Sequence, residues 1–172
     1  MSTAEFPLLT STIQETLRYT TYILPIRRVT EPVEFGGYRF DAGDEVLCLT
    51  RSVHFDEEIH VNASVYDPGR YMKQKRFSKN GETVANHSMP RGGGVSMCEG
   101  RSVFVHFHVT QVQFSRHFAT RELKAFMVLM LMQYTIEIDT NSSERPSFKW
   151  ERIGAGIMHP RGDVRVILRA RD

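Results

Sequence analysis

The sequence predicts an α+β fold in which two helices are joined by short strands and by a long segment of turns. Three observations predict it. Apolar residues recur at helical spacing within residues 8–19 and 117–133, short alternating runs bounded by glycine or proline follow each helix, and residues 51–90 show neither period. At 172 residues the chain has the length of one ordinary domain.

The first helix is expected over residues 8–19, with an apolar face formed by Leu9, Ile13 and Leu17. Thr10 and Ser11 are candidate helix caps, and Pro25 is expected to end the helix. Residues 27–40 then alternate around Gly36-Gly37, which predicts a strand, a turn and a second strand.

The remaining elements follow from the same patterns. Residues 45–50 are expected to form a buried strand that carries Cys48. Residues 51–90 are expected to form turns, and so long a segment inside a domain usually carries a functional surface. Residues 117–133 predict a helix rich in Leu, Met and Phe, and strands are expected near 135–138, 148–153 and 164–168.

Composition excludes several classes of protein. Lys and Arg (22) nearly balance Asp and Glu (20), and a formal net charge of +2 is too small for a nucleic-acid-binding surface. Two cysteines cannot form a disulfide framework, so a reducing compartment is expected. The longest apolar run, 125–132, is too short to span a bilayer, and the first residues do not resemble a signal peptide.

Cys98 is the residue best suited to chemistry. Three glycines flank it and let the backbone approach a flat ligand closely: Gly92, Gly94 and Gly100. The helix that follows favours a thiolate over a thiol, and a thiolate can donate charge to a haem iron. The alternative is a small buried apolar residue, which is the commoner role of a lone cysteine.

Glu15 and Arg18 lie three residues apart on the first helix and are therefore neighbours on its surface. Such spacing usually gives a solvated ion pair of little energetic value. Arg70 changes this expectation, because the turn at residues 66–71, Tyr-Asp-Pro-Gly-Arg-Tyr, can bring a second guanidinium to the same carboxylate.

Three motifs thus follow one another: Glu-x-x-Arg, aromatic-x-Pro-x-Arg-aromatic and Gly-x-Gly-x-x-x-Cys-x-Gly-Arg. In this order they resemble the C-terminal part of a cytochrome P450, over almost the whole chain. The resemblance implies that residues 1–172 are a partial P450 domain, the haem-binding part of a mainly helical fold with small β-sheets and a long meander. It also implies that Cys98 is the axial iron ligand of haem b, and that a structural charge lock is formed by Glu15, Arg18 and Arg70.

The same resemblance implies further haem-binding residues. Arg27 matches the strand arginine that binds a haem propionate, with Arg28 as the adjacent alternative. Ser96 stands where an arginine or histidine often meets a propionate, which leaves more of that task to Arg27. Arg91 replaces the aromatic residue that normally packs beside the sulfur, and is expected to add charge there.

Residues 151–160, Glu-Arg-Ile-Gly-Ala-Gly-Ile-Met-His-Pro, resemble the family's hairpin whose tip reaches the substrate pocket. Their Gly-x-Gly…Pro form is similar to the branch that contains sterol 7-alpha-hydroxylases and prostacyclin synthase, and to many fungal members. Ile23, Leu24 and Ile157 are then candidates to face the substrate; the alternative is that they are core residues.

Residues 102–116 depart from the family pattern, in which the segment matching 118–124 follows Cys-x-Gly-Arg almost at once. We predict that this β-prone block is an aberrant insertion, a short intron retained in frame. Transcripts that all contain it, with genomic ends other than GT and AG, would contradict this. His106 and His108 share a strand face, but no further ligands at a metal-binding spacing accompany them.

The resemblance implies a haem-thiolate monooxygenase that inserts one oxygen atom of O2 into an apolar substrate, such as a sterol, a fatty acid or a secondary metabolite. The intact parent would receive electrons from NADPH-cytochrome P450 reductase or a similar donor, at the endoplasmic reticulum membrane. This chain lacks the anchor and the long central helix of the family, so it is expected to be cytoplasmic and inactive alone. A non-catalytic haem-binding fragment and a haem-thiolate isomerase or peroxygenase are the alternatives.

Overall fold

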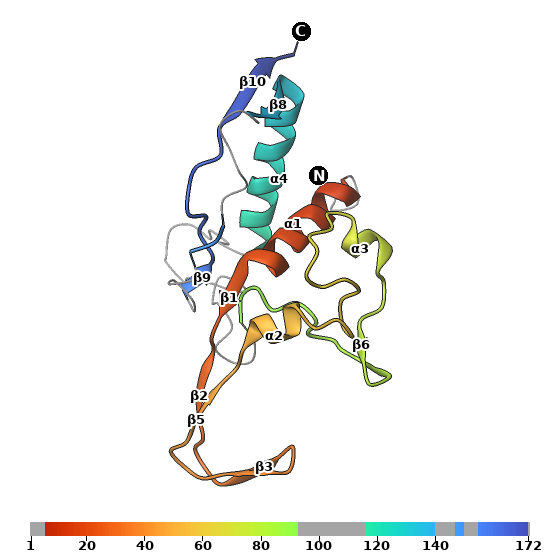
Figure 1. The fold of residues 1–172 in the computed structure, drawn as a ribbon. Helices are drawn as coiled ribbons and strands as arrows, with labels where there is room; N and C mark the ends of the chain where they lie inside the picture. The colour runs from red at the N-terminus through yellow and green to blue at the C-terminus, as the bar shows by residue number, and fades with distance from the viewer. Residues whose placement is uncertain (1–5, 93–115, 140–146, 150–154, 172) are drawn as a thin grey trace, which may run out of the picture.

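The computed structural model describes residues 6–92, 116–139, 147–149 and 155–171 (Figure 1). Two long helices, α1 (Pro7–Thr20) and α4 (Arg116–Gln133), are accompanied by the short helices α2 (Thr50–His54) and α3 (Arg70–Lys73). All sheets in the described part are small and antiparallel. The predicted α+β class is confirmed.

Each described sheet has two strands. Two are local hairpins, β3 (Val33–Phe35) with β4 (Tyr38–Phe40) and β6 (Ser78–Lys79) with β7 (Glu82–Thr83). Three join strands that are farther apart in sequence: β1 (Thr21–Ile23) with β9 (Ala155–Ile157), β2 (Ile26–Arg28) with β5 (Glu45–Leu47), and β8 (Tyr134–Ile138) with β10 (Val166–Ala170). The β1–β9 pair returns the C-terminal part of the chain to the end of α1.

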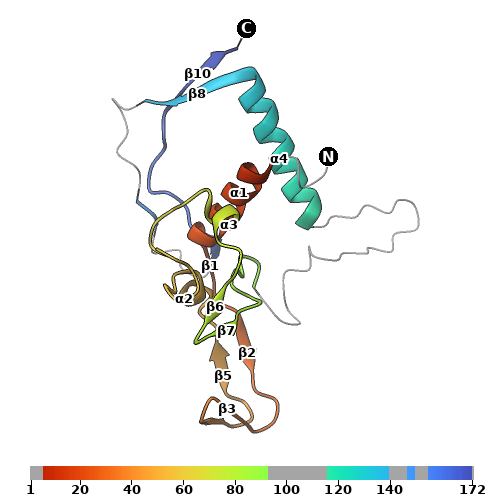
Figure 2. The same cartoon turned by 90° about the vertical axis from the view of Figure 1, so that its right-hand side faces the viewer.

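Strands β2 and β5 form an arm that projects from α1 and α2 and ends in the β3–β4 hairpin (Figures 1 and 2). Helix α4 and the β8–β10 pair lie at the opposite end of the molecule. At the tip of the arm, Gly36 and Gly37 have φ values of 61° and 80°. A two-residue hairpin turn needs positive φ at both positions, which glycine adopts freely. The predicted turn is therefore confirmed.

The centre of the fold is mostly polar. Among the residues that the structure describes, the buried apolar side chains are Ile13, Ile59, Ala63, Phe77 and Met158. Buried polar or charged side chains outnumber them: Ser11, Glu15, Arg18, Thr21, Thr50, His54, His60 and Arg70. Buried polar groups stabilise a fold only when they are paired, so hydrogen bonds decide how α1, α3 and the intervening loops fit together.

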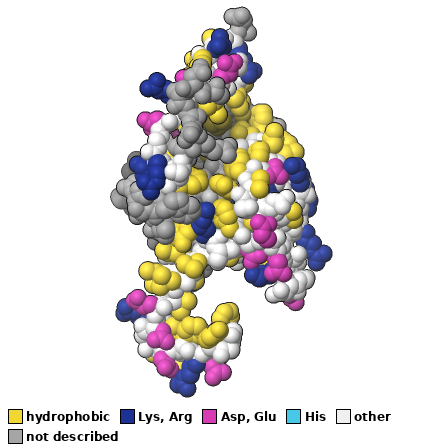
Figure 3. Space-filling view, viewed as in Figure 1, with side chains coloured by type: hydrophobic (Ala, Val, Ile, Leu, Met, Phe, Trp, Pro, Cys, Tyr) yellow, Lys and Arg dark blue, Asp and Glu magenta, His cyan; other side chains and the backbone are white. Residues whose placement is uncertain are grey.

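Helix α4 contributes little to this centre, because none of its described side chains is fully buried. Its exposed apolar residues include Phe126, Leu129 and Met132, the last with 68% of its surface exposed. Figure 3 shows hydrophobic side chains gathered over this upper part of the molecule and along the inner side of the arm's tip.

The predicted caps of the first helix are wrong. Helix α1 starts with Pro7, a residue favoured in the first turn because it lacks an N–H, and the preceding Phe6 makes no side-chain cap. Thr10 lies inside the helix and donates its hydroxyl to the Phe6 carbonyl at 2.9 Å, while Ser11 accepts the Tyr71 N–H at 3.1 Å. The helix ends at Thr20, one residue past the predicted range, and β1 (Thr21–Ile23) separates it from Pro25, which therefore does not end it.

The prediction of a buried strand around Cys48 is also wrong. Strand β5 ends at Leu47, and Cys48 is exposed. Residues 46–49 are a continuous apolar run, which predicts burial, but β5 pairs only with β2 in the described structure and its outer residues, Glu45 and Leu47, are exposed. Of the predicted strand at 148–153, only its first two residues are described, and Phe148 forms an isolated bridge with Pro160.

Candidate functional site

Glu15 is at the centre of the charge lock. Arg18, one turn along α1, donates Nε–H to Oε2 and Nη2–H to Oε1, both at 2.8 Å. Arg70 donates Nε–H to Oε2 at 3.0 Å, and the Asp67 backbone N–H reaches Oε1 at 3.0 Å. Glu15 and Arg18 have no exposed surface, so the predicted meeting of two arginines on one carboxylate is observed as a fully buried cluster.

The pKa of Glu15 is held below its ordinary value. Burial alone would raise this pKa, but the hydrogen bonds from Arg18, Asp67 and Arg70 outweigh it. The carboxylate is therefore charged at neutral pH and serves as the counter-ion of both guanidinium groups.

Both guanidinium groups also donate to backbone carbonyls. Arg70 donates Nη1–H to Val61 and Nη2–H to Asn62 and Val65, the last two at 3.0 and 2.7 Å. Arg18 donates Nη1–H to the His54 carbonyl at 2.5 Å. These hydrogen bonds thus hold the loop before α3 and the end of α2 in place.

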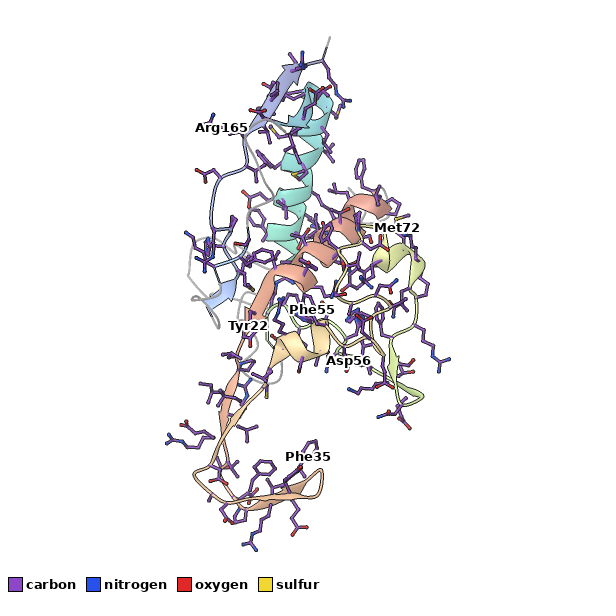
Figure 4. All side chains as sticks on the ribbon, in the orientation of Figure 1. Tyr22, Phe35, Phe55, Asp56, Met72 and Arg165 are labelled. Atoms are coloured by element: carbon purple, nitrogen blue, oxygen red, sulfur yellow. The ribbon has the colours of Figure 1, made fainter. Side chains whose placement is uncertain are left out.

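Phe55, which follows α2 and is labelled in Figure 4, lies beside two arginine guanidinium groups. The Arg51 guanidinium carbon is 3.9 Å from the centre of the Phe55 ring, and that of Arg18 is 5.2 Å away. Arg51 also lies near the Tyr22 ring of β1, with 5.9 Å between ring centre and guanidinium carbon. These cation–π contacts join Arg18 of the cluster to Phe55, and Phe55 through Arg51 to Tyr22 of β1.

Two histidines that the sequence analysis missed bind the segment leading to Cys98. His54 Nε2 accepts the Met89 N–H at 2.9 Å, and His60 Nε2 is 2.8 Å from the His87 carbonyl oxygen. Both imidazoles are fully buried. Neither histidine belongs to one of the three motifs, so the sequence held no signal for these contacts beyond the residue type.

Arg27 and Arg28 occupy successive positions of β2, so their side chains leave opposite faces of the strand. Arg28 pairs with Glu45 of the neighbouring strand at 3.1 Å, with 71% and 55% of the two side chains exposed. Arg27 is half-buried. Of the two predicted candidates, Arg27 is the one directed away from this solvent-exposed pair.

Gly92 marks the start of the cysteine loop and lies against Pro25. Its φ is +75°, and a Cβ at this position would be 3.7 Å from the Pro25 Cγ. The loop therefore starts beside the segment that carries Leu24 and Arg27. Next to it, a pocket of about 360 Å³ is lined by Gln14 and Leu17 of α1, Tyr71, and residues 86–92.

Several predicted site residues lie outside the described part of the chain: Gly94, Ser96, Cys98, Gly100, His106, His108 and the block 102–116 up to its last residue. Of the substrate-facing candidates, Ile23 and Leu24 are half-buried and Ile157 is 57% exposed. Ile23 and Ile157 lie on neighbouring strands of the β1–β9 ladder, two positions apart, since Ile157 pairs with Thr21 and Ile23 pairs with Ala155.

Within residues 6–92, 116–139, 147–149 and 155–171, three or more His, Cys, Asp or Glu side chains nowhere gather as a metal site would require. In the same residues, every helix falls short of the length or apolar character needed to cross a membrane.

A family model described as Cytochrome P450 matches residues 2–166. The chain is 28% identical to Cytochrome P450 7A1 of Oryctolagus cuniculus, 28% to Prostacyclin synthase of Rattus norvegicus, and 31% to 7-alpha-hydroxycholest-4-en-3-one 12-alpha-hydroxylase of Homo sapiens. These matches cover 93%, 96% and 92% of this chain but only 31%, 32% and 31% of the relatives. The chain thus spans about a third of their length.

Solved structures show the same fold. Retinoic acid bound cyanobacterial CYP120A1 aligns with a TM-score of 0.68 and 21% identity, over 99% of this chain and 35% of that one. Cytochrome P450EX alpha (CYP152N1) with myristic acid aligns with a TM-score of 0.66 and 18% identity, over 95% of this chain and 34% of that one.

Proposed function

Because the chain belongs to the cytochrome P450 family, we propose that it is the haem-binding part of a haem-thiolate monooxygenase, from the branch that its C-terminal hairpin resembles. The parent would insert one oxygen atom of O2 into an apolar substrate such as a sterol, a fatty acid or a secondary metabolite. The observation that carries this proposal is the buried Glu15–Arg18–Arg70 cluster, which lies in the same chain as the Gly-rich cysteine loop.

Members of this family bind haem b, and the described residues fit that group. Gly92 has a φ of +75°, which glycine adopts freely, and this turn leads the chain into the cysteine loop beside Pro25, close to β2. On β2 the half-buried Arg27 offers a guanidinium, which suits a carboxylate such as a haem propionate.

In the proposed site, Cys98 is the axial ligand, and Arg27 binds a propionate with Ser96 nearby. Close approach of the backbone is permitted by Gly92, Gly94 and Gly100. When bound, haem supplies the oxidation chemistry, and an axial thiolate favours cleavage of the O–O bond. The protein's own part is to hold the thiolate, neutralise the propionate and exclude water.

Glu15, Arg18 and Arg70 have a positioning role in this proposal. Their hydrogen bonds end on each other or on backbone groups of residues 54–67, so they set the framework from which residues 87–92 extend toward Cys98. Ile23, Leu24 and Ile157 are proposed to face the apolar substrate, since an exposed isoleucine beside β1 has apolar surface left to bury.

The partners belong to the proposal as well. The parent would take electrons from NADPH-cytochrome P450 reductase or a similar donor, bind O2, and reside at the endoplasmic reticulum membrane. We also propose that residues 1–172 form a partial domain that is inactive alone, interrupted by an aberrant insertion at 102–116. The same chain without residues 102–116 is then expected to bind haem more tightly than the full chain.

The test compares two cysteines. The purified 172-residue chain is loaded with haem, reduced and exposed to carbon monoxide, and its difference spectrum is recorded for the wild type, Cys98→Ser and Cys48→Ser. The thiolate band is expected in the wild type and in Cys48→Ser, whose cysteine is exposed, and is expected to be lost in Cys98→Ser. Identical spectra for all three chains would refute the proposal, and substrate turnover by this chain would refute its inactivity.

A further inference from the structure

We propose that His54 and His60 are positioning residues that fasten residues 87–89 to the Glu15–Arg18–Arg70 cluster, and that the His54 contact holds only while its imidazole is neutral. Met89 precedes Cys98 by nine residues, so these contacts set where the cysteine loop begins. The inference rests on the proposed function, because it assigns a role in placing the loop that would present the thiolate.

His54 connects the cluster and the loop through two atoms of one residue. Its carbonyl accepts Nη1–H of Arg18 at 2.5 Å, and its Nε2 accepts the Met89 N–H at 2.9 Å. A backbone N–H can only donate, so Nε2 must carry a free lone pair. A proton on Nε2 would place two donors against each other and break the contact with Met89.

His60 makes the complementary contact. The His87 carbonyl can only accept, so His60 donates Nε2–H to it at 2.8 Å. The His87 ring also stacks on Phe77, with ring centres 3.6 Å apart, which keeps the carbonyl in place. The other His60 nitrogen, Nδ1, is buried and has no hydrogen-bond partner, so a second proton there would be an unpaired buried donor.

The surroundings disfavour a charge on either ring. Charged and titratable groups facing His54 are His60, Arg18 and Arg51, and those facing His60 are Arg18, His87 and Arg70. Burial and these neighbours lower the pKa of both histidines to about 4, while the backbone at Thr21 and His87 acts in the opposite direction. Acid therefore breaks the contact between His54 and Met89, because a charged His54 ring has no lone pair left to accept the Met89 N–H. A charged His60 ring keeps its donation to the His87 carbonyl but gains an unpaired buried donor at Nδ1.

The experiment measures hydrogen exchange of the Met89 amide in the full 172-residue chain, corrected for the intrinsic rate at each pH. In the wild type we expect protection at pH 7 and an at least tenfold loss at pH 4. His54→Gln is expected to keep protection at both pH values, because its side-chain carbonyl accepts the N–H but does not titrate. His54→Phe is expected to lose protection already at pH 7.

His60 is tested by the same amide. His60→Gln can still donate to the His87 carbonyl and is expected to keep protection at pH 7, whereas His60→Leu is expected to lose it about tenfold. The matched control is His159→Gln, since His159 is exposed and is expected to behave as the wild type. The reference amide is Val29, which donates to the Asp44 carbonyl at 2.9 Å in the arm and is expected to stay protected at pH 4.

Three results would overturn the proposal: an acid-induced loss in His54→Gln equal to that of the wild type, unchanged protection of Met89 in His54→Phe, or an equal loss at Val29. If a non-polar variant fails to fold, the two glutamine variants and the pH series of the wild type still test the proposal. Haem does not enter the measurement. Failure of the Cys98→Ser test would thus remove the proposed function and leave the result at Met89 as it stands.

Discussion

Arg70 donates its Nε–H to the Glu15 carboxylate at 3.0 Å across 55 residues of chain. Arg18 binds the same carboxylate from the same helix, so one buried negative charge holds two buried positive charges. Removing a partner from such a cluster strands an unpaired charge in a medium of low polarity, which costs far more than the intact pair contributes.

Glu15→Gln is therefore expected to destabilise the chain by about 3–5 kcal/mol, the range for breaking a buried ion pair. Urea unfolding at pH 7 measures this. The control is Glu45→Gln, which removes the exposed pair with Arg28 and is expected to cost less than about 1 kcal/mol. Equal losses in the two variants would show that the cluster has no special role.

The stability of the chain is expected to depend on pH through His54 and His60. Both have a pKa of about 4 in the folded chain against 6.5 for the free side chain. Between these values the unfolded chain binds more protons, so the free energy of unfolding rises with pH from 4 to 6.5 and is fully gained above it. Each histidine contributes roughly 3 kcal/mol to this rise.

Urea unfolding at steps of pH between 4 and 7 checks this expectation. The double variant His54→Gln/His60→Gln has no imidazole at these positions and is expected to give a flatter curve. A slope as steep as that of the wild type would assign the pH dependence to other groups.

Arg27→Gln is expected to weaken haem binding about tenfold, the loss that corresponds to roughly 1.4 kcal/mol from a charge-assisted hydrogen bond. Arg28→Gln is expected to change the affinity less than about twofold, because Arg28 already pairs with Glu45 on the solvent side of the strand. Titration of the chain with haem, followed by absorbance, measures both. The reverse order of effects would make Arg28 the propionate ligand.

Gly92→Ala is expected to destabilise the chain by about 1–2 kcal/mol, because its φ of +75° is unfavourable for any residue with a Cβ. The new Cβ would meet Pro25 Cγ at 3.7 Å, an ordinary contact, so the cost comes from the backbone and not from a clash. Gly162→Ala is the matched control, with open space around its Cβ and no positive φ. Urea unfolding measures the free energy of unfolding of both variants, and equal losses in the two would contradict the expectation.

Elements with a strong local period were predicted well. The helix at residues 8–19 is α1, the helix at 117–133 is α4, and the turn at Gly36-Gly37 closes the β3–β4 hairpin. An error arose where a short apolar run was taken as a measure of burial, at Cys48, which is exposed. An apolar run favours burial, but what covers a strand depends on other parts of the chain.

The sequence by itself determined the order and spacing of the three motifs, and with them the family and the identity of Cys98 as the proposed ligand. Only the tertiary structure decided that Glu15 and Arg18 are buried and not a surface pair, and that His54 joins their cluster to Met89. The physical reason is that the sequence shows contacts between near neighbours along the chain but not contacts between distant residues. Helical spacing makes Glu15 and Arg18 neighbours whatever surrounds them, whereas burial and the contacts of distant residues exist only once the chain has folded.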